Sequence, residues 1–361
     1  MVVKKEKRDV HTFLKQLPPR PASEVRKSLI AMARRGGITL VVGAGVSVPR
    51  RIPNWEYLAR AMWKSAFSKS RTPWAAGRES LREVPQFLPI VFELVYRQLG
   101  EKEFIEILRK NLYARVRYPG DDKAFKSSTE SLAVVAELIL REYKRKTGRR
   151  IDSVITLNAD DLIEQAVNTL AGPRTKDEML RQPIVRSIAR STHLDPGGRS
   201  ARPIPIYHIH GFLPSGRLQH TGSYDHMFVF TDAQYWSTSA SALTFANRVM
   251  SWALNEGRCI FIGLSMTDIN LLRWLALRTL ERDRDFAEAA QNPLISPRHF
   301  QIMRSQFGRH FWIRPRSTDP SGFLSRFLRL RGIEPVQIGA WRGKAFERLM
   351  ERCFPRERSQ S

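Results

Sequence analysis

Cysteine is scarce in this chain of 361 residues, which contains only Cys259 and Cys353. Two cysteines can form neither a disulfide framework nor a four-cysteine zinc site. Long hydrophobic runs are lacking as well, because no stretch approaches the ~18 uninterrupted apolar residues of a membrane-spanning helix. The N-terminal region also lacks the apolar run of a secretory signal. We therefore expect a cytoplasmic protein that does not enter a membrane.

Acidic residues are few relative to basic ones. The chain has 35 Asp and Glu against 60 Lys and Arg, which gives a net charge of +25. The excess is +7 over residues 1–35, +10 over 36–150 and +8 over 301–361, whereas residues 151–300 are neutral. An excess of this size attracts nucleic acid, acidic lipid or an acidic protein. Chemistry carried by the middle of the chain would therefore lie in a charge-balanced segment.

The composition excludes a disordered chain, since hydrophobic residues make up 42% and aromatic residues 10% of the sequence. The length suits one large domain or two. Residues 1–35 form a basic segment that contains Pro18, Pro19 and Pro21. We expect residues 36–361 to form a single folded domain after this N-terminal segment.

Short apolar runs predict strands buried in a parallel sheet. These runs are 38–42, 154–157, 204–209, 228–230, 258–262, 310–313 and 335–338. Helical spacing of apolar residues marks the segments 23–34, 55–67, 84–143, 160–170, 232–255, 268–280, 323–330 and 341–353. The polar residues 172–202 are predicted to form a loop. The alternation predicts an α/β fold, a Rossmann-like, doubly wound and mainly parallel sheet with a helical insertion at about 80–150.

A glycine-rich loop, Gly43-Ala44-Gly45-Val46-Ser47, follows the first predicted strand. Glycines at the carboxyl end of a parallel strand let the backbone approach an anionic group such as a pyrophosphate. Val48 stands where the usual dinucleotide fingerprint has its third glycine. The alternative interpretation is a tight turn between a strand and a helix.

Polar or small residues also follow three later strands, of which the one that ends in a histidine pair is described in the next paragraph. Asn158 and Asp160 come after the second predicted strand, where they face the ligand crevice of an open sheet or merely cap the next helix. Gly263 and Ser265 end another strand, ahead of Asp268 as a candidate N-cap. Four such features at four strand ends favour one shared ligand site over four independent turns.

The pair His208 and His210 ends a further strand, with both side chains on one strand face. A metal site would need additional ligands, and none lies at a familiar spacing. One interpretation is a satisfied core histidine with a second histidine at the strand tip. The other makes His210 a general base, because a neutral imidazole titrates near working pH.

The series from Gly43 to Ser265, together with Ile52-Pro53-Asn54-Trp55, resembles the sirtuin pattern in the right order. More closely, it is similar to the zinc-free sirtuin-like branch of bacterial anti-phage defence, over residues 38 to about 280. The resemblance implies NAD-binding residues that are listed here: Gly43, Ala44, Gly45 and Ser47 at the pyrophosphate, Asp160 at the nicotinamide, and Gly263 and Ser265 toward the adenosine. It also implies two catalytic residues, Asn158 at the nicotinamide ribose and attacking group, and His210 as the catalytic histidine.

Two departures separate the chain from protein-deacylating sirtuins. The four-cysteine zinc module is missing, and the Asp-Phe-Arg that follows Ile-Pro in sirtuins is Asn54-Trp55-Glu56 here. Trp55 still offers an aromatic wall over the nicotinamide, whereas the role of the arginine is unfilled. The resemblance therefore implies an NAD glycohydrolase that uses NAD as its substrate and holds no zinc or other metal.

The expected function is hydrolysis of NAD to ADP-ribose and nicotinamide, for NAD depletion in anti-phage defence. The resemblance further implies a homo-oligomer that is triggered by assembly or by a partner, such as a HerA-type ATPase or an Argonaute-like protein. The alternative is a module that senses NAD or ADP-ribose while its basic flanks bind nucleic acid, or a nuclease subunit of a defence complex. The sequence shows no ATPase phosphate-binding motif and no carboxylate cluster of a metal nuclease.

Overall fold

A computed structural model describes most of the chain. The described residues are 20–67, 88–145, 148–175, 178, 182–193, 202–218, 228–292, 294–296, 298, 310–341 and 343–356. Most of the basic N-terminal segment, residues 84–87 of the predicted helical stretch, and the end of the chain from residue 357 lie outside them.

Seven strands in the described residues form one sheet in which every neighbouring pair is parallel. In spatial order they are β3 (Val185–Ile188), β4 (Ile204–His208), β2 (Ile151–Thr156), β1 (Ile38–Val42), β5 (Arg258–Ile262), β6 (His310–Pro315) and β7 (Ile333–Ile338). The central strand β1 is buried at every residue, as its unbroken apolar run predicts. The predicted α/β fold class is confirmed.

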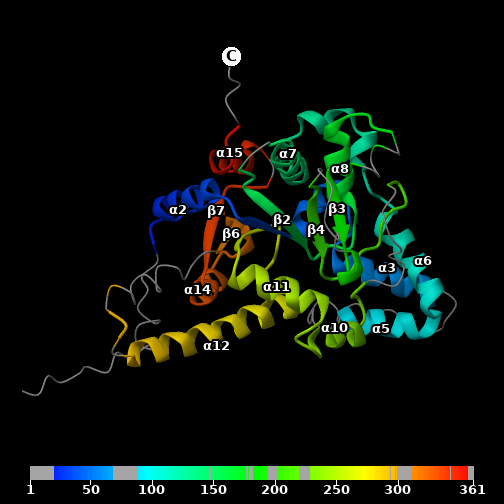
Figure 1. Ribbon diagram of the computed structural model, residues 1–361. Helices are drawn as coiled ribbons and strands as arrows, with labels where there is room; N and C mark the ends of the chain where they lie inside the picture. Colours follow the sequence, from blue (N-terminus) through cyan, green and yellow to red (C-terminus); the bar gives the residue numbers. More distant parts are fainter. Residues whose placement is uncertain are drawn as a thin grey trace, which may run out of the picture.

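Helices cover both faces of this sheet (Figure 1). One face packs against α2 (Ala22–Arg35), α7 (Ser131–Lys144), α8 (Leu162–Ala171) and α15 (Lys344–Cys353). The other face packs against α11 (Phe245–Asn255), α12 (Ile269–Gln291) and α14 (Phe323–Leu330). Each face of the sheet has its own hydrophobic core, and alternate residues of β1 point into the two cores. Leu40 packs in the core on the first face and Val41 in the core on the other. This is the layered arrangement of a doubly wound fold.

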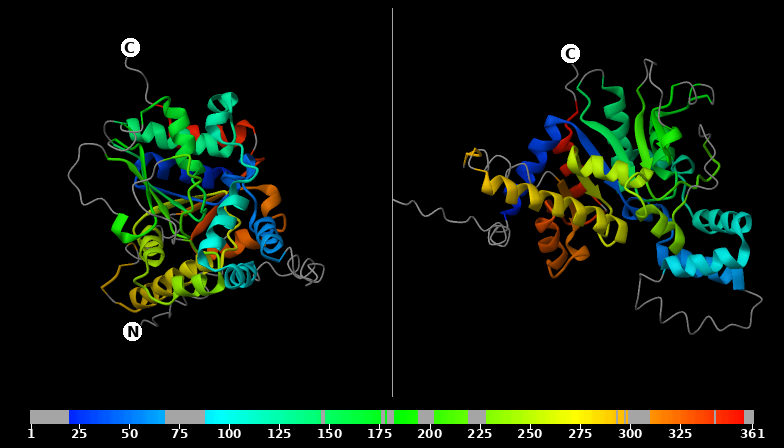
Figure 2. Two further views of the ribbon diagram at one scale, coloured as in Figure 1. Left: turned by 90° about the vertical axis from the view of Figure 1, so that its right-hand side faces the viewer. Right: turned by 60° about the horizontal axis from the view of Figure 1, so that its bottom comes forward.

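A helical insertion separates β1 from β2. Its helices α3 (Trp55–Phe67), α5 (Leu88–Leu99) and α6 (Glu101–Tyr113) pack on one another and lie at the right of Figure 1, with α10 (Asp232–Ser239) against α5. Two 3-10 turns, η4 (Pro119–Asp121) and η5 (Lys123–Ser127), then lead into α7. The two views of Figure 2 show these helices beside the sheet layers rather than within them. The insertion therefore stands near the carboxyl end of β1, where the glycine-rich loop begins.

Two of the predicted elements are wrong. Residues 172–202 contain the edge strand β3, which the short and half-polar sequence Val185-Arg186-Ser187-Ile188 does not reveal. Residues 228–230 form no strand of the sheet, because only Phe228 makes an isolated antiparallel bridge, with Gly211. Phe228 and Phe230 are instead buried among aromatic side chains of the insertion. The apolar run was a correct sign of burial but not of strand pairing.

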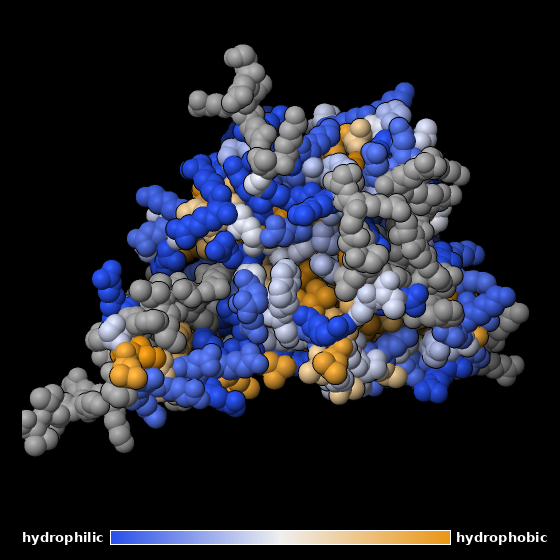
Figure 3. All heavy atoms as spheres, viewed as in Figure 1, coloured by the Kyte–Doolittle hydropathy of each residue, from blue (hydrophilic) through white to orange (hydrophobic). Residues whose placement is uncertain are grey.

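The face seen in Figure 3 is mostly hydrophilic, with hydrophobic side chains gathered along its lower edge over α10 and α12. The exposed large apolar side chains of these two helices include Trp236, Leu277 and Leu280. Helix α12 is also longer than predicted, ending at Gln291 rather than near residue 280. Among the described residues, every helix is too short or too polar to cross a bilayer.

Candidate active site

The four strand-end features lie side by side at one edge of the sheet. They follow β4, β2, β1 and β5, which are consecutive in the spatial order of the strands. All of these strands are parallel, so their carboxyl ends meet at the same edge. The sequence predicted the features one by one, and the topology brings them together.

The glycine-rich loop is locked against the loop that follows β5. The Gly43 amide donates to the Ile262 carbonyl at 2.9 Å, and the Gly45 amide donates to the Gly263 carbonyl at 2.8 Å. The amides of Val46 and Ser47 donate within the loop itself, to the carbonyls of Gly43 and Ala44. Gly263 has a φ of +68°, which favours glycine. These glycines thus allow the backbones of the two loops to approach each other closely.

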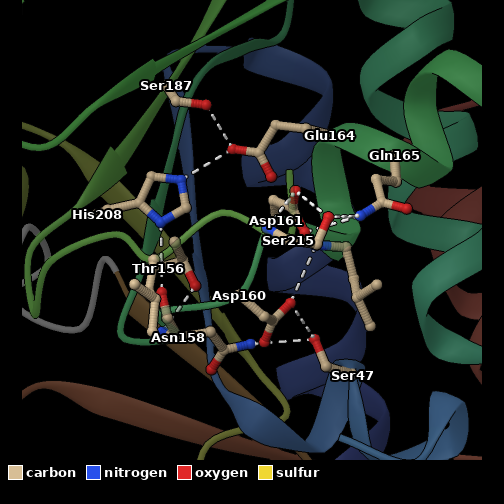
Figure 4. Close-up of polar contacts among 12 residues, drawn as sticks. Ser47, Thr156, Asn158, Asp160, Asp161, Glu164, Gln165, Ser187, His208 and Ser215 are labelled. Atoms are coloured by element: carbon tan, nitrogen blue, oxygen red, sulfur yellow. Dashed lines mark hydrogen bonds and ion pairs between the residues drawn. The ribbon is translucent and has the colours of Figure 1, made fainter. Parts of the chain in front are cut away.

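The hydroxyl of Ser47 joins this loop to the residues after β2. Ser47 Oγ donates to Asp160 Oδ1 at 3.1 Å and accepts from Asn158 Nδ2 at 3.3 Å. All three side chains are buried, and Figure 4 shows them pointing toward one another. The structure therefore brings Ser47, Asn158 and Asp160 together, although they come from distant parts of the sequence.

Asp160 is also tied to the start of α8, because its Oδ1 atom accepts from the Leu162 amide at 3.1 Å. This contact is similar to a helix cap, although the N-cap residue of α8 is Asp161. Burial raises the pKa of Asp160 to about 7, against the opposing effects of the Leu162 amide and the Ser47 hydroxyl. Near neutral pH this carboxyl group therefore exists in both its acid and its charged form.

Replacing Asp160 by asparagine is expected to stabilise the fold at alkaline pH. A carboxyl whose pKa rises on folding weakens the native state as the pH climbs from its unfolded value toward 7. Asparagine carries no charge, so Asp160→Asn should gain about 1–4 kcal/mol at pH 8 and little near pH 4. Urea unfolding of both proteins at the two pH values measures this gain. An equal gain at both pH values would contradict the buried charge as its cause.

A second buried network lies behind Asn158. His208 Nε2 contacts Glu164 Oε1 at 2.8 Å, and its Nδ1 atom lies 3.3 Å from the Asn158 carbonyl oxygen. Glu164 also accepts from Ser187 Oγ at 2.7 Å, which ties α8 to the edge strand β3. His208 is the satisfied core histidine of the pair, and its ring contacts the backbone of Asn158 (Figure 4).

Asp161 anchors the insertion to the site. Its Oδ1 atom accepts from the Tyr113 hydroxyl at 3.2 Å and from Gln165 Nε2 at 2.8 Å. Its Oδ2 atom accepts from the amide and the hydroxyl of Ser215 at 3.0 and 2.8 Å. The Leu213 carbonyl oxygen lies 2.7 Å from the same Tyr113 hydroxyl and shares its one proton with Asp161. One fully buried carboxylate thus joins α6, α8 and the loop after β4.

Charged contacts hold the rest of the insertion to the glycine-rich loop. Arg50 is buried and pairs with Glu130 and, at 2.7 Å, with Asp122. Its guanidinium lies 4.5 Å from the centre of the Phe125 ring. These contacts therefore fasten the segment that leads into α7 to Arg50, three residues after the glycine-rich loop.

His210 belongs to a different set of contacts. It is buried at the tip of β4, where its ring lies 5.5 Å from that of Tyr235 and 6.4 Å from that of Trp274. Its Nε2 atom faces Asp268 Oδ1 at 3.8 Å and has no hydrogen-bond partner in the described residues. Burial lowers the pKa of His210, and the Asp268 charge opposes this. At neutral pH the ring is therefore a neutral base.

Trp55 stands at the start of α3, in the aromatic group that covers this region. Its ring is 4.9 Å from Phe230 and 6.2 Å from Tyr235, the ring that also contacts His210. On the other side, Ser265 is exposed and its hydroxyl lies 2.7 Å from the hydroxyl of Thr267. Trp55 is thus linked to His210 through Tyr235, whereas Ser265 faces outward.

Two buried polar atoms at this edge lack hydrogen-bond partners in the part of the chain that the structure describes, His210 Nε2 and Asn270 Nδ2. Such groups are costly to bury unless something binds them. His210 follows β4, and Asn270 lies in the first turn of α12, the helix that follows β5. An open sheet takes its ligand beyond the carboxyl ends of its strands. The site therefore fits a ligand with hydrogen-bonding groups, such as a nucleotide.

No set of three or more metal-ligating side chains that could hold a metal ion occurs within the described ranges. Both cysteines are free and buried, Cys259 in β5 and Cys353 at the end of α15. Burial raises the pKa of each thiol to about 12, so both stay protonated at neutral pH. Neither thiol is suited to act as a nucleophile.

Sequence reasoning missed several residues of the site, namely Tyr113, Asp161, Glu164, Ser187, Ser215 and Tyr235. A weak signal existed for Glu164, because it stands among the apolar residues Ile163, Ala166 and Val167 on a helix predicted to face the sheet. A carboxylate in such a position must find a buried partner. Its partners come from β3 and β4, which the local sequence could not indicate.

Comparison with known proteins identifies the family. The family model described as a SIR2-like domain matches residues 152–336, about half of the chain. The match runs from β2 into β7, so it includes Asn158, Asp160 and His210 but not the glycine-rich loop. No curated protein matches the chain.

Proposed function

The chain belongs to the family of SIR2-like domain proteins, and from this premise we propose that it hydrolyses NAD to ADP-ribose and nicotinamide. Proteins of this family bind NAD and are broadly NAD-dependent enzymes. The observation that carries the finer proposal is the convergence of Ser47, Asn158 and Asp160 beside the carboxyl end of β4, where His210 has an unsatisfied ring nitrogen.

The proposed reaction breaks the bond between the ribose C1′ atom and the nicotinamide nitrogen. The bonding electron pair leaves with nicotinamide, which becomes neutral, and the ribose gains oxocarbenium character. A water oxygen then bonds to C1′, and its proton passes to His210, directly or through a ribose hydroxyl. Because the leaving group needs no acid, holding the ribose and the water in place supplies much of the rate.

Asn158 suits the positioning role in this reaction. Its side chain is buried, and its backbone is held from both sides, by Thr156 Oγ1 at 3.0 Å from its amide and by the His208 ring. A side chain with a fixed backbone loses little entropy when it binds the ribose hydroxyls and the attacking water. We assign Asn158 this contact.

Asp160 suits the recognition of the nicotinamide carboxamide. Its two hydrogen bonds to Ser47 and Leu162 both end on Oδ1, and Oδ2 takes part in neither. With a pKa of about 7, the carboxyl can accept from the carboxamide NH₂ group or donate to its oxygen. Trp55 lies on the aromatic side of the same region and is proposed as the wall over the nicotinamide ring.

We propose that the chain is a hydrolase of NAD and not a protein deacylase. Protein deacylation in the family it resembles is associated with a four-cysteine zinc module, and this sequence has only two cysteines. We likewise propose that the activity serves to deplete NAD in anti-phage defence. The proposed trigger is assembly into a homo-oligomer or binding of a partner, either an ATPase or an Argonaute-like protein.

The test is NAD consumption by the purified chain, with nicotinamide and ADP-ribose identified as products. Asn158→Ala and His210→Ala are each expected to lower turnover at least about 100-fold, because each removes a group that acts on the reacting atoms. Circular dichroism and thermal unfolding check that both variants fold, and Lys344→Ala, at an exposed position of α15, serves as the control.

Undiminished turnover in both folded variants would overturn these assignments. If the wild type consumes no NAD, assays with candidate triggers and labelled nucleic acid over a salt series separate the alternatives. Steeply salt-dependent binding of nucleic acid, without NAD loss under any trigger, would support the sensing module with basic flanks instead.

A further inference from the structure

Asp268 lies opposite the unsatisfied nitrogen of His210. The two residues come from different elements, since His210 follows β4 and Asp268 is the N-cap of α12. The 3.8 Å between His210 Nε2 and Asp268 Oδ1 is too long for a hydrogen bond but within ion-pair range. His210 is 2% exposed, so bulk solvent does little to screen its interaction with this carboxylate.

The Asp268 carboxylate is held in place by two donors. Its Oδ1 atom accepts from the Leu271 amide at 2.9 Å, which caps α12. Its Oδ2 atom accepts from the Tyr235 hydroxyl at 3.4 Å. Burial and the Asp268 charge raise the pKa of Tyr235 well above its usual value, so this hydroxyl keeps its proton and donates. The carboxylate therefore cannot swing away from His210 without losing both contacts.

Other charged groups near this pair do not replace Asp268. Arg273 lies one turn further along α12, and its guanidinium donates to Asn247 Oδ1 at 2.7 Å. It interacts electrostatically with Asp268 rather than with His210. On β4 itself, His208 pairs with Glu164. Tyr235 and Trp274, which complete the cover of His210, bring no charge at neutral pH.

We propose that Asp268 is the positioning residue of His210, which orients the imidazole for proton uptake and then stabilises its positive charge. This inference rests on the proposed hydrolysis of NAD, in which His210 takes a proton from the attacking water. The proton stays on the ring, and Asp268 remains charged throughout. Tyr235 supports the same arrangement, because its hydroxyl fixes the carboxylate from the far side.

The physical need for such a group follows from the burial of His210. An imidazolium ion in an apolar site is unfavourable, and burial alone therefore makes the ring a weak base. A fixed carboxylate at ion-pair distance restores part of that basicity. Without its charge, His210 should take up a proton less readily, and hydrolysis should slow accordingly.

The decisive variant is Asp268→Asn. Asparagine is as good an N-cap as aspartate, so α12 should still begin at Ile269, and only the charge is removed. The first measurement is an NMR titration of protein labelled with ¹³C-histidine, in which His210→Gln assigns the signal. The pKa of His210 is expected to be lower by about 1 in Asp268→Asn. Asp232→Asn, on the first turn of α10, is the matched control and should leave it unchanged.

The second measurement is the pH profile of NAD hydrolysis. In Asp268→Asn the rising limb of kcat/KM is expected to move to lower pH, and kcat should fall about 10-fold while KM changes little. Tyr235→Phe keeps the ring and removes the hydroxyl, so it should give a smaller change in the same direction. A merely structural role of Asp268 would alter stability without moving the pH profile.

The titration tests the role of Asp268 and the assay tests the hydrolysis of NAD, so a negative result of one can be told apart from a negative result of the other. An unchanged pKa of His210 in Asp268→Asn overturns the inference, whether or not NAD is consumed. A lowered pKa in a protein that hydrolyses no NAD under any trigger would refute the proposed function and, with it, the catalytic meaning of the pair. A lowered pKa together with the shifted profile supports both.

Discussion

Replacing Gly45 by valine is expected to prevent the chain from reaching its native fold. A Cβ atom at this position would lie 2.8 Å from the Gly263 carbonyl oxygen and 2.9 Å from its Cα atom. These are backbone atoms of a loop that is itself fixed by β5, so they cannot move aside as a flexible side chain would. Valine adds two further methyl groups just beyond the carboxyl ends of β1 and β5, which are paired along their full length.

The expected result for Gly45→Val is loss of the cooperative unfolding transition and recovery mainly in the insoluble fraction. Circular dichroism on thermal unfolding and the soluble yield measure it. Gly339→Val is the matched control, because a Cβ atom there would meet nothing within 4 Å and the backbone has no positive φ. A Gly45→Val protein as stable as the control would show that the two loops do not touch as described.

Replacing Asp161 by alanine is expected to lower the free energy of unfolding by at least about 3 kcal/mol. The carboxylate is fully buried and accepts from Tyr113, Gln165 and Ser215. Alanine would leave the Ser215 amide without this acceptor and would open a void between α6 and α8. Hydrogen bonds to a charged group are the stronger kind, and a buried donor that loses its partner is destabilising in addition.

Urea unfolding of Asp161→Ala against wild type measures this loss. Asp121→Ala is a suitable control, because Asp121 belongs to the same insertion and pairs with Arg217 at 2.8 Å, but on the exposed surface. Surface ion pairs contribute little, so this variant should change the free energy of unfolding by less than about 1 kcal/mol. Equal effects of the two substitutions would argue against Asp161 as the anchor of the insertion.

The central strands were predictable because a strand that is buried on both faces has an unbroken run of apolar residues. The predicted bounds of β1 and β5, 38–42 and 258–262, are those of the structure. The same holds for α14, Phe323–Leu330, whose apolar stripe packs on the sheet. In these elements, the local pattern and the tertiary environment favour the same conformation.

The edge of the sheet was not predictable in the same way. Strand β3 has four residues, and only one of its sides pairs with another strand. Its pattern of buried and half-buried residues is too short to distinguish it from a loop. The strands that pair with β1 could not be predicted either, because the order of strands in the sheet depends on crossover connections that leave no local sequence pattern.

The site was predictable as a set of residues but not as a set of contacts. Ser47, Asn158, Asp160 and His210 were singled out because they follow strands, and the structure places all of them at one edge. The partners that fix them, Glu164, Tyr235 and Asp268, act through long-range contacts. Asp268 was expected as a helix cap, which it is, and its position opposite His210 adds a second role.

The pairing of β1 with both β2 and β5 has a consequence for the order of folding during synthesis. Strand β1 is complete at Val42, whereas its second partner begins only at Arg258. Until the ribosome has produced β5, one side of β1 presents unpaired backbone groups between apolar side chains, which is the surface most prone to aggregation. A nascent chain truncated between β4 and β5 should therefore depend on chaperones far more than the finished protein does.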